Sequence, residues 1–416
     1  MALQAKVVSF LLSDGIVGTT QAITGVGFQP KVVIPFWGGS LNGSNEILRG
    51  DVRIGIGFGV SSTSRRCAGG WINDAEGTSE TAAFARDDAL VTTYEAGNVI
   101  SGRWDLVSLD ADGFTIVVDV DAPTASAVRC HALCIGGADV TDVTIGTFNG
   151  SGSAGNQDIT GLGFQPDIVM LLAAGTGTIP QNIAGARLSF GAGDGTRNGV
   201  LSVGNEDGQG TINNVRYSND TDCLLLMPAA MTVATRANLS TMLADGFRLN
   251  WQTGSTRPVF YLAIKGGSWR VDDVLTATSL TTVVASGFGF QPKGVFVASH
   301  GGSASTPGTL QNGWGVSLGA ADSTTSRGAH GSREEDAIGT SEPYFSIRYD
   351  ALYVHQAAGA ATVDGLMDLQ SFDADGITFV MDDADPTNAF VFFIAMGDTP
   401  PGAGGSEGHI SLLGVG

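Results

Sequence analysis

Short apolar runs that directly follow a proline recur three times along the chain. The motif Gly-x-Gly-Phe-Gln-Pro stands before each run. A continuous apolar run of this length predicts a strand that is buried on both faces, and a proline at its start removes no hydrogen bond from the sheet. The motif residues are Phe28, Gln29, Pro30, Phe164, Gln165, Pro166, Phe290, Gln291 and Pro292.

A second pattern, Ala-Asp-Gly followed by Phe or Ile, also recurs three times. Its residues are Asp112 and Gly113, Asp245 and Gly246, and Asp375 and Gly376. Asp-Gly between segments of alternating apolar and polar residues is the strongest short-range signal of a β-hairpin. We therefore predict a hairpin late in each third of the chain.

The spacing of the motifs defines the predicted domain organisation. The phenylalanines of the first motif are separated by 164 − 28 = 136 and 290 − 164 = 126 residues, and the blocks recur in the same order. A repeat of about 130 residues with strand signals every 8–12 residues is typical of a β-sandwich. We predict an all-β protein of three tandem homologous, jelly-roll-like β-sandwich repeats, residues 1–137, 138–267 and 268–397. The near absence of linkers predicts that they form a compact pseudo-trimer.

Residues 398–416 have a different composition. A linker rich in glycine and proline precedes the apolar end His409–Gly416. This pattern predicts a C-terminal arm that docks elsewhere. A frayed end, or a strand that folds back on the third repeat, explains the same composition.

Composition and charge exclude several classes of protein. The 416 residues are 43% hydrophobic, which excludes a disordered chain. The formal net charge of −20 would repel a phosphate backbone, so nucleic acid is not an expected partner. No apolar run approaches the roughly 20 residues of a membrane helix, and the N-terminus lacks the pattern of a secretory signal. We interpret the four cysteines as reduced and buried, as in a protein made in a reducing cytosol.

The aspartates around the hairpins are weak candidates for a calcium site. Hard oxygen ligands gathered at one end of a hairpin suit calcium, although the EF-hand spacing is missing and hairpin turns favour the same residues. The candidates are Asp110, Asp112, Asp119, Asp121, Asp373 and Asp375. We expect no bound cofactor.

Catalytic patterns are not convincing in this sequence. The five histidines do not recur at equivalent positions, and no Gly-x-Ser-x-Gly elbow is present. Glu80 and Glu342 recur in two repeats within Gly-Thr-Ser-Glu, which we interpret as an exposed turn rather than a glycosidase pair. We therefore predict that the protein is not an enzyme. The six tryptophans could stack on sugars, but their positions do not recur, so packing is the simpler explanation.

The Gly-Phe-Gln-Pro motif with its apolar strand and the later Asp-Gly-Phe hairpin resembles β-rich modules of virion proteins in tailed bacteriophages. The resemblance spans residues 1–397, with Lys31 and Lys293 where Asp167 keeps the acidic form, and Ile377 in place of Phe. It implies a structural role in a virion assembled in the host cytoplasm, and it does not point to catalytic residues.

The position within the virion is a separate inference. The sequence shows no coiled-coil, collagen-like or β-helical shaft of a fibre, so a capsid decoration or cement protein is our first expectation. Its partner would be the major capsid protein. The alternative is a tail-attached module, with tail proteins as partners, that binds a receptor or a host-surface glycan.

Overall fold

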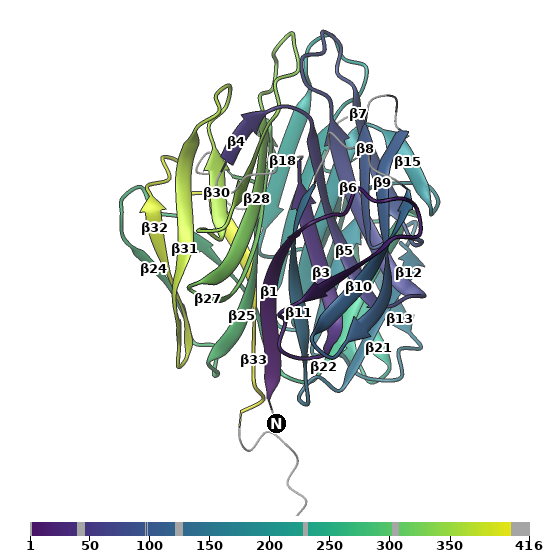
Figure 1. The fold of residues 1–416 in the computed structure, drawn as a ribbon, viewed down its shortest axis with the longest axis vertical. Helices are drawn as coiled ribbons and strands as arrows, with labels where there is room; N and C mark the ends of the chain where they lie inside the picture. The colour runs from purple at the N-terminus through teal and green to yellow at the C-terminus, as the bar shows by residue number, and fades with distance from the viewer. Residues whose placement is uncertain are drawn as a thin grey trace, which may run out of the picture.

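The computed structural model describes residues 2–39, 46–95, 97, 99–120, 128–227, 232–301 and 308–400. These residues form antiparallel strands and no α-helix (Figure 1), which confirms the predicted all-β sandwich fold. Accordingly, no helix long and apolar enough to cross a membrane occurs in them. The predicted C-terminal arm lies outside the described residues from position 401 onward, and so does Asp121.

Residues 1–137, 138–267 and 268–397 are called units 1, 2 and 3. The strands of unit 1 are β1 (Leu3–Leu11), β2 (Thr20–Thr24), β3 (Pro30–Gly38), β4 (Glu46–Arg49), β5 (Val52–Ser61), β6 (Ser64–Ile72), β7 (Thr81–Arg86), β8 (Val91–Glu95), β9 (Val99–Asp110), β10 (Gly113–Val120) and β11 (Arg129–Gly137). Those of unit 2 are β12 (Asp142–Asn149), β13 (Gly155–Thr160), β14 (Ile168–Ala173), β15 (Gln181–Ala184), β16 (Ala186–Gly193), β17 (Asn198–Asn205), β18 (Asn214–Asn219), β19 (Leu224–Leu226), β20 (Thr235–Leu243), β21 (Gly246–Thr253) and β22 (Pro258–Lys265). Those of unit 3 are β23 (Ser268–Leu275), β24 (Thr282–Ser286), β25 (Pro292–Ser299), β26 (Gln311–Asn312), β27 (Trp314–Ser323), β28 (Ser326–Glu334), β29 (Tyr344–Arg348), β30 (Tyr353–Gln356), β31 (Val363–Asp373), β32 (Gly376–Asp383) and β33 (Phe390–Gly397).

Each unit contributes to a large and a small sheet, and the strand order is the same in all three. In unit 1 the large sheet runs β1-β11-β3-β5-β6-β7 and the small sheet runs β2-β10-β9-β8; the corresponding strands take the same places in units 2 and 3. The predicted Asp-Gly hairpins are confirmed, and they join β9 to β10, β20 to β21 and β31 to β32.

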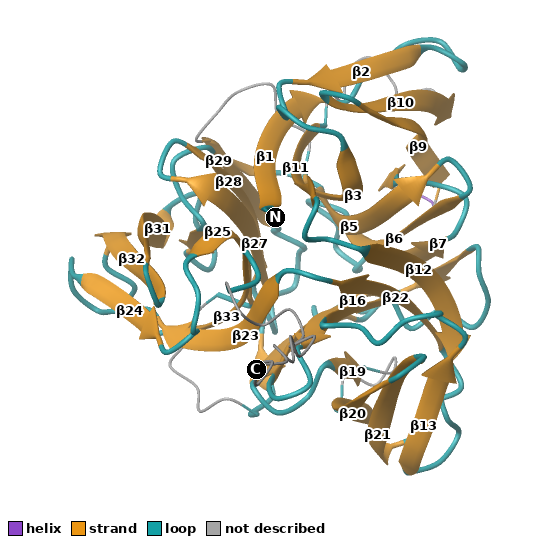
Figure 2. Ribbon diagram, turned by 90° about the horizontal axis from the view of Figure 1, so that it is seen from below, coloured by secondary structure: helices purple, strands orange, loops and turns teal. Residues whose placement is uncertain are grey.

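A seventh strand completes each large sheet, and it comes from a different unit. Strand β15 of unit 2 pairs with β7 of unit 1, β26 of unit 3 pairs with β18 of unit 2, and β4 of unit 1 pairs with β29 of unit 3. Because every unit gives one strand and receives one, the exchange closes into a ring. Figure 2 shows the resulting three lobes around a common centre.

Both faces of each large sheet are covered. One face packs against the small sheet of the same unit, and the other faces a central core to which all three units contribute. In this central core the ring of Phe296 lies 5.3 Å from that of Phe36 and 5.2 Å from that of Phe190, measured between centroids. The strands that follow the motif, β3, β14 and β25, are buried along nearly their whole length, as their apolar runs predict.

The two ends of the molecule differ. Strand β1 begins and β33 ends at the same end, where the Leu3 amide donates a 2.8 Å hydrogen bond to the Asp398 carboxylate. The loops that join β6 to β7, β17 to β18 and β28 to β29 lie at the opposite end (Figure 1).

Candidate functional site

The two recurring motifs bind each other. In unit 1 the amides of Gly25 and Gly27 donate to the Asp112 carboxylate at 3.2 and 2.5 Å, and the Gln29 side chain donates to the Leu109 carbonyl at 2.7 Å. These backbone hydrogen bonds lower the pKa of Asp112, because they favour the charged carboxylate.

Units 2 and 3 repeat this arrangement. The amides of Gly161 and Gly163 donate to Asp245, and the amide of Gly289 donates to Asp375. Gln165 and Gln291 donate to carbonyls of the preceding hairpin strand at 2.8 and 3.0 Å. In each unit, the glycine and glutamine residues of the first motif are therefore hydrogen-bonded to the Asp-Gly hairpin of the second motif. We call this contact the fastening.

The glycine of each Asp-Gly pair is required by close packing. A Cβ atom at Gly113, Gly246 or Gly376 would stand less than 3.0 Å from a backbone carbonyl of the neighbouring edge strand. Close packing also explains two other glycines. Phe28 lies against Gly136 and Phe290 lies against Gly397, so a Cβ on either glycine would meet the aromatic ring. The recurrence of these residues follows from packing and backbone geometry.

The calcium candidates are engaged in hairpin contacts. Asp110 accepts hydrogen bonds from Ser108 and Thr115, both at 2.7 Å, and Asp373 accepts equivalent bonds from Ser371 and Thr378. Asp119 faces Arg103 at 3.5 Å. Across the described ranges, no cluster of three or more His, Cys, Asp or Glu residues could hold a metal ion.

The other candidates from the sequence also have structural partners. Glu80 accepts hydrogen bonds from the Asn73 side chain and the Gly97 amide, and Glu342 of unit 3 pairs with Arg49 of unit 1 at 3.2 Å. Five tryptophans are fully buried; they are Trp37, Trp71, Trp104, Trp251 and Trp314. The four cysteines are free and buried, as predicted.

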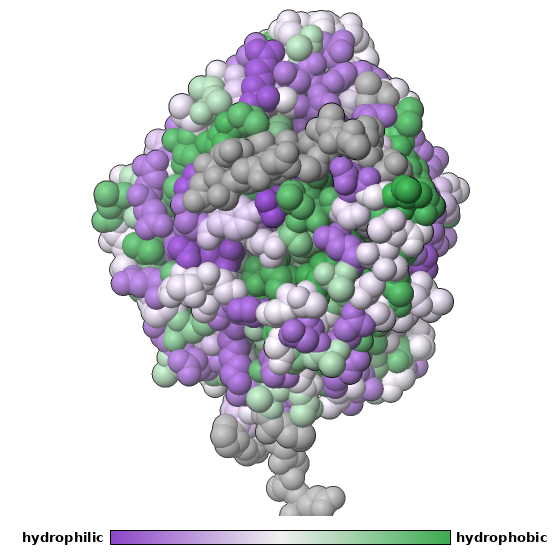
Figure 3. Space-filling model, in the orientation of Figure 1, coloured by the Kyte–Doolittle hydropathy of each residue, from purple (hydrophilic) through white to green (hydrophobic). Residues whose placement is uncertain are grey.

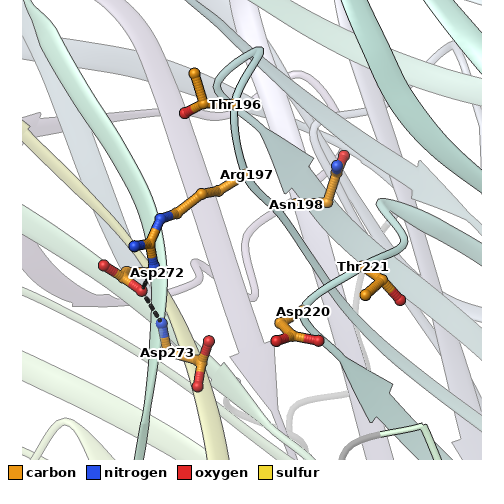
Figure 4. A pocket seen from close by; sticks show the side chains of 7 residues that line it. All are labelled: Thr196, Arg197, Asn198, Asp220, Thr221, Asp272 and Asp273. Atoms are coloured by element: carbon orange, nitrogen blue, oxygen red, sulfur yellow. Dashed lines mark hydrogen bonds and ion pairs between the residues drawn. The ribbon is translucent and has the colours of Figure 1, made fainter.

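A polar cleft of about 360 Å³ opens at the seam between units 2 and 3 (Figure 4). Arg197, from the β16–β17 hairpin, pairs with Asp272 of β23. Burial, together with the charges of Asp220 and Asp272, raises the pKa of Asp273 to about 6. The cleft thus gathers acidic groups at a contact between units.

Three loops interlock at the end of the molecule opposite the N-terminus, and we call them the clasp: residues 73–80, 206–213 and 335–342. Ser79 exchanges backbone hydrogen bonds with Gly208 and Gln209, at 2.7 and 2.8 Å. The same exchange recurs between Ile212 of unit 2 and residues 337–338 of unit 3, and between Ser341 of unit 3 and residues 75–76 of unit 1. The clasp therefore closes a second ring across all three units.

The backbone conformation of the clasp recurs as well. Ala75 and Ala337 have φ angles of 63° and 61°, and Gly208 stands at the equivalent position with a φ of 74°. The middle repeat lacks the Ser and Glu of Gly-Thr-Ser-Glu, yet Gly210 and Thr211 keep the loop. This surviving Gly-Thr pair is the sequence signal that could have identified the clasp in unit 2.

A buried carboxyl lies beneath the clasp, and sequence reasoning missed it. Glu334, the last residue of β28, is 1% exposed. Its Oε2 accepts from the side-chain amides of Asn205 and Asn214, and its Oε1 lies 2.6 Å from the Ser341 hydroxyl. The same hydroxyl lies 2.6 Å from the Asn73 carbonyl. Glu334 thus joins units 2 and 3 directly and is connected to unit 1 through Ser341.

The protonation of Glu334 follows from this geometry. Burial raises its pKa to about 7, although the hydrogen bonds from Ser341, Asn214 and Asn205 act in the opposite direction. The Ser341 hydroxyl has one proton but lies beside two oxygens, Oε1 of Glu334 and the Asn73 carbonyl. It can bond to both only if Glu334 is protonated and donates to the hydroxyl, which then donates to Asn73.

The seam between units 1 and 3 contains two buried histidines. The rings of His131 and His330 lie 4.7 Å apart, and His131 also contacts the Ser9 hydroxyl at 2.5 Å. Burial and the positive charge of Arg129 lower the pKa of His131 to about 3. Burial also lowers the pKa of His330 well below its usual value. Both rings are therefore neutral at physiological pH.

No protein-family model matches this chain, and no curated protein matches its sequence.

Proposed function

We propose that the chain is a non-enzymatic structural protein of a virion, a capsid decoration or cement protein that binds the capsid exterior and stabilises it. The observation that carries this proposal is the double closure of the molecule. A ring of exchanged strands and the clasp both link unit 3 back to unit 1.

This construction suits a protein that binds a shell and resists mechanical load. In a homotrimer the same contacts would depend on the concentration of the subunits, whereas one chain keeps its three lobes together at any dilution. A body with three similar lobes also matches a three-fold or quasi-three-fold position on a capsid. Its partner would be the major capsid protein.

The orientation on the shell follows from the two ends. The sequence after Pro400, with its glycine-rich linker and apolar end, continues from the end that holds Leu3 and Asp398. We place that end toward the shell, so that the arm can act as a tie. The clasp then faces outward.

Quantitative mass spectrometry of purified particles tests this proposal. We expect many copies of the chain for each particle, in fixed proportion to the major capsid protein, and earlier release of the genome on heating when the chain is absent. A few copies for each particle would contradict the cement function. Complete absence from particles would contradict any virion role, and a turnover lost on Glu80→Gln or Glu342→Gln would contradict the non-enzymatic assignment.

A second candidate function is a tail-attached receptor-binding module, and exposed apolar residues favour it. Ile16 is 81% exposed in the β1–β2 loop of unit 1, and Leu280 is 69% exposed in the corresponding loop of unit 3. Unit 2 has only Gly, Ser and Ala between Gly150 and Ala154. On the face shown in Figure 3, apolar residues lie in scattered patches between polar ones.

The same loops provide the test of this second candidate. The purified protein should block adsorption of the virus, and Ile16→Asp with Leu280→Asp should abolish the block. If the doubly substituted protein blocks adsorption as well as the original does, these loops do not bind the receptor.

A further inference from the structure

Two arginines of unit 2 share one pocket, and neither forms an ion pair within the described part of the chain. Arg187 of β16 and Arg257, which directly precedes β22, line a pocket of about 180 Å³ together with Thr235 and Ser255. This arrangement is unusual in a chain with twice as many acidic as basic residues, 41 against 21.

Arg187 carries an unsatisfied donor. Its Nε is buried and has no hydrogen-bond partner, and its Nη2 makes only a long 3.5 Å contact with the Ala184 carbonyl. Burial lowers the pKa of Arg187, and the charge of Arg257 acts in the same direction, while Glu206 opposes them. An arginine does not lose its proton at ordinary pH, so Arg187 keeps a half-buried positive charge that makes no salt bridge within the described residues.

The equivalent arginine of unit 1 shows what unit 2 lacks. Arg53 donates to the Asp51 carboxylate at 3.3 Å and to the Tyr94 carbonyl at 3.0 Å. Gly185 stands in unit 2 where Asp51 stands in unit 1, so Arg187 has lost this carboxylate. Arg187 therefore lacks the ion pair that Arg53 makes.

Arg257 is a second departure confined to unit 2. Its carbonyl accepts from the Gly150 amide, just as the carbonyls of Val128 and Ala389 accept from the amides of Leu12 and Thr276. The equivalent positions therefore hold buried apolar residues in units 1 and 3, whereas unit 2 places a cation there. One Nη atom of Arg257 lies 3.1 Å from where a Cβ of Gly177 would stand, so the side chain lies against the loop after β14.

Hydroxyl groups complete the pocket. The Ser255 hydroxyl accepts from the Arg257 amide at 3.2 Å, which leaves its own proton for another acceptor. The Thr235 hydroxyl makes only a 3.4 Å bond to the Gly254 carbonyl. Residues 228–231, which separate two parts of the lining, lie outside the described residues, and their sequence Pro-Ala-Ala-Met contains no carboxylate.

We propose that unit 2 binds a small oxyanion group, a phosphate, sulfate or carboxylate, between Arg187 and Arg257. Guanidinium groups recognise these anions through charge-assisted hydrogen bonds, and the proton of the Ser255 hydroxyl adds a neutral donor. The described residues of units 1 and 3 do not repeat this pair of arginines, so we expect one site per chain. The site is independent of the proposed virion function.

Titration calorimetry with the full chain tests the site. Phosphate, sulfate and acetate are each added at constant ionic strength, with chloride as the reference. We expect at least one of them to bind saturably at one site per chain. Arg187→Gln or Arg257→Gln should lower the association constant about 10- to 100-fold. Comparison of the three anions identifies the preferred group.

Arg53→Gln is the matched control, because Arg53 is the equivalent arginine with its own carboxylate. It should leave anion binding unchanged. The proposal is overturned if none of the three anions binds more tightly than chloride, or if Arg187→Gln and Arg257→Gln bind them as tightly as the unmodified chain. Thermal unfolding scans of each variant without anion establish that it is folded.

Discussion

Replacement of Glu334 by glutamine should make the protein more stable at alkaline pH. The side chain has almost the same shape, and its amide can donate to the Ser341 hydroxyl while its carbonyl accepts from Asn205 and Asn214. Glutamine thus reproduces the protonated form of Glu334 at every pH. The charged form, in contrast, leaves the Ser341 proton shared between two acceptors.

The size of the effect follows from the pKa shift. The pKa of Glu334 rises from 4.5 to about 7 on folding, and each pKa unit corresponds to about 1.4 kcal/mol. Because the folded state binds the proton more tightly, this stabilisation is fully present below pH 4.5 and is lost as the pH rises through 7. Between about pH 4.5 and pH 8.5 the unmodified protein should therefore lose about 3 kcal/mol relative to Glu334→Gln.

Urea unfolding followed by tryptophan fluorescence, at a series of pH values, measures this difference. Glu342→Gln is the control, since this carboxylate belongs to the same loop region but lies at the surface beside Arg49. Loss of this partly exposed ion pair should change the free energy of unfolding by less than about 1 kcal/mol. A constant difference between Glu334→Gln and the unmodified protein across the series would refute the reasoning.

Three further predictions concern the seam, the fastening and the central core. His131→Phe should reduce the loss of stability in acid. Because the folded state keeps His131 neutral, the free energy of unfolding falls by about 1.4 kcal/mol for each pH unit below 6.5, down to the pKa of about 3. Urea unfolding midpoints from pH 7 to pH 5 measure this, and the same dependence on pH in the variant and the unmodified protein would contradict it. Gly113→Ala should lower the free energy of unfolding by roughly 2 kcal/mol or more, since the φ of Gly113 is 137° and a Cβ would meet the Ile23 carbonyl. The control Gly77→Ala, with open space around it, should change this free energy by no more than about 0.5 kcal/mol in the same urea assay. Equal effects of the two substitutions would argue against close packing at Gly113. Phe190→Ala should lower the free energy of unfolding by about 3–5 kcal/mol, and a loss below about 1 kcal/mol would show that the central core does not depend on this ring.

The sequence by itself determined the local structure. The alternation of apolar residues and the Asp-Gly pairs identified the hairpins, and the apolar runs after Pro30, Pro166 and Pro292 identified the strands that are covered on both faces. These features are readable because a strand repeats every two residues and an Asp-Gly turn has few alternatives. The motif residues were found for the same reason, although their role as partners of one another required the structure.

Only the tertiary structure decided how the units close on one another. Strand β26 has two residues and β4 has four, too few for any pattern of alternation, and each is a strand only because the edge of another unit supplies its hydrogen bonds. Glu334 likewise reads as a surface residue within Arg-Glu-Glu-Asp, yet it is buried and is bound by Asn205 and Asn214 of unit 2. Contacts between segments far apart in the chain depend on which edges and loops meet in space, and the local sequence carries no record of that choice.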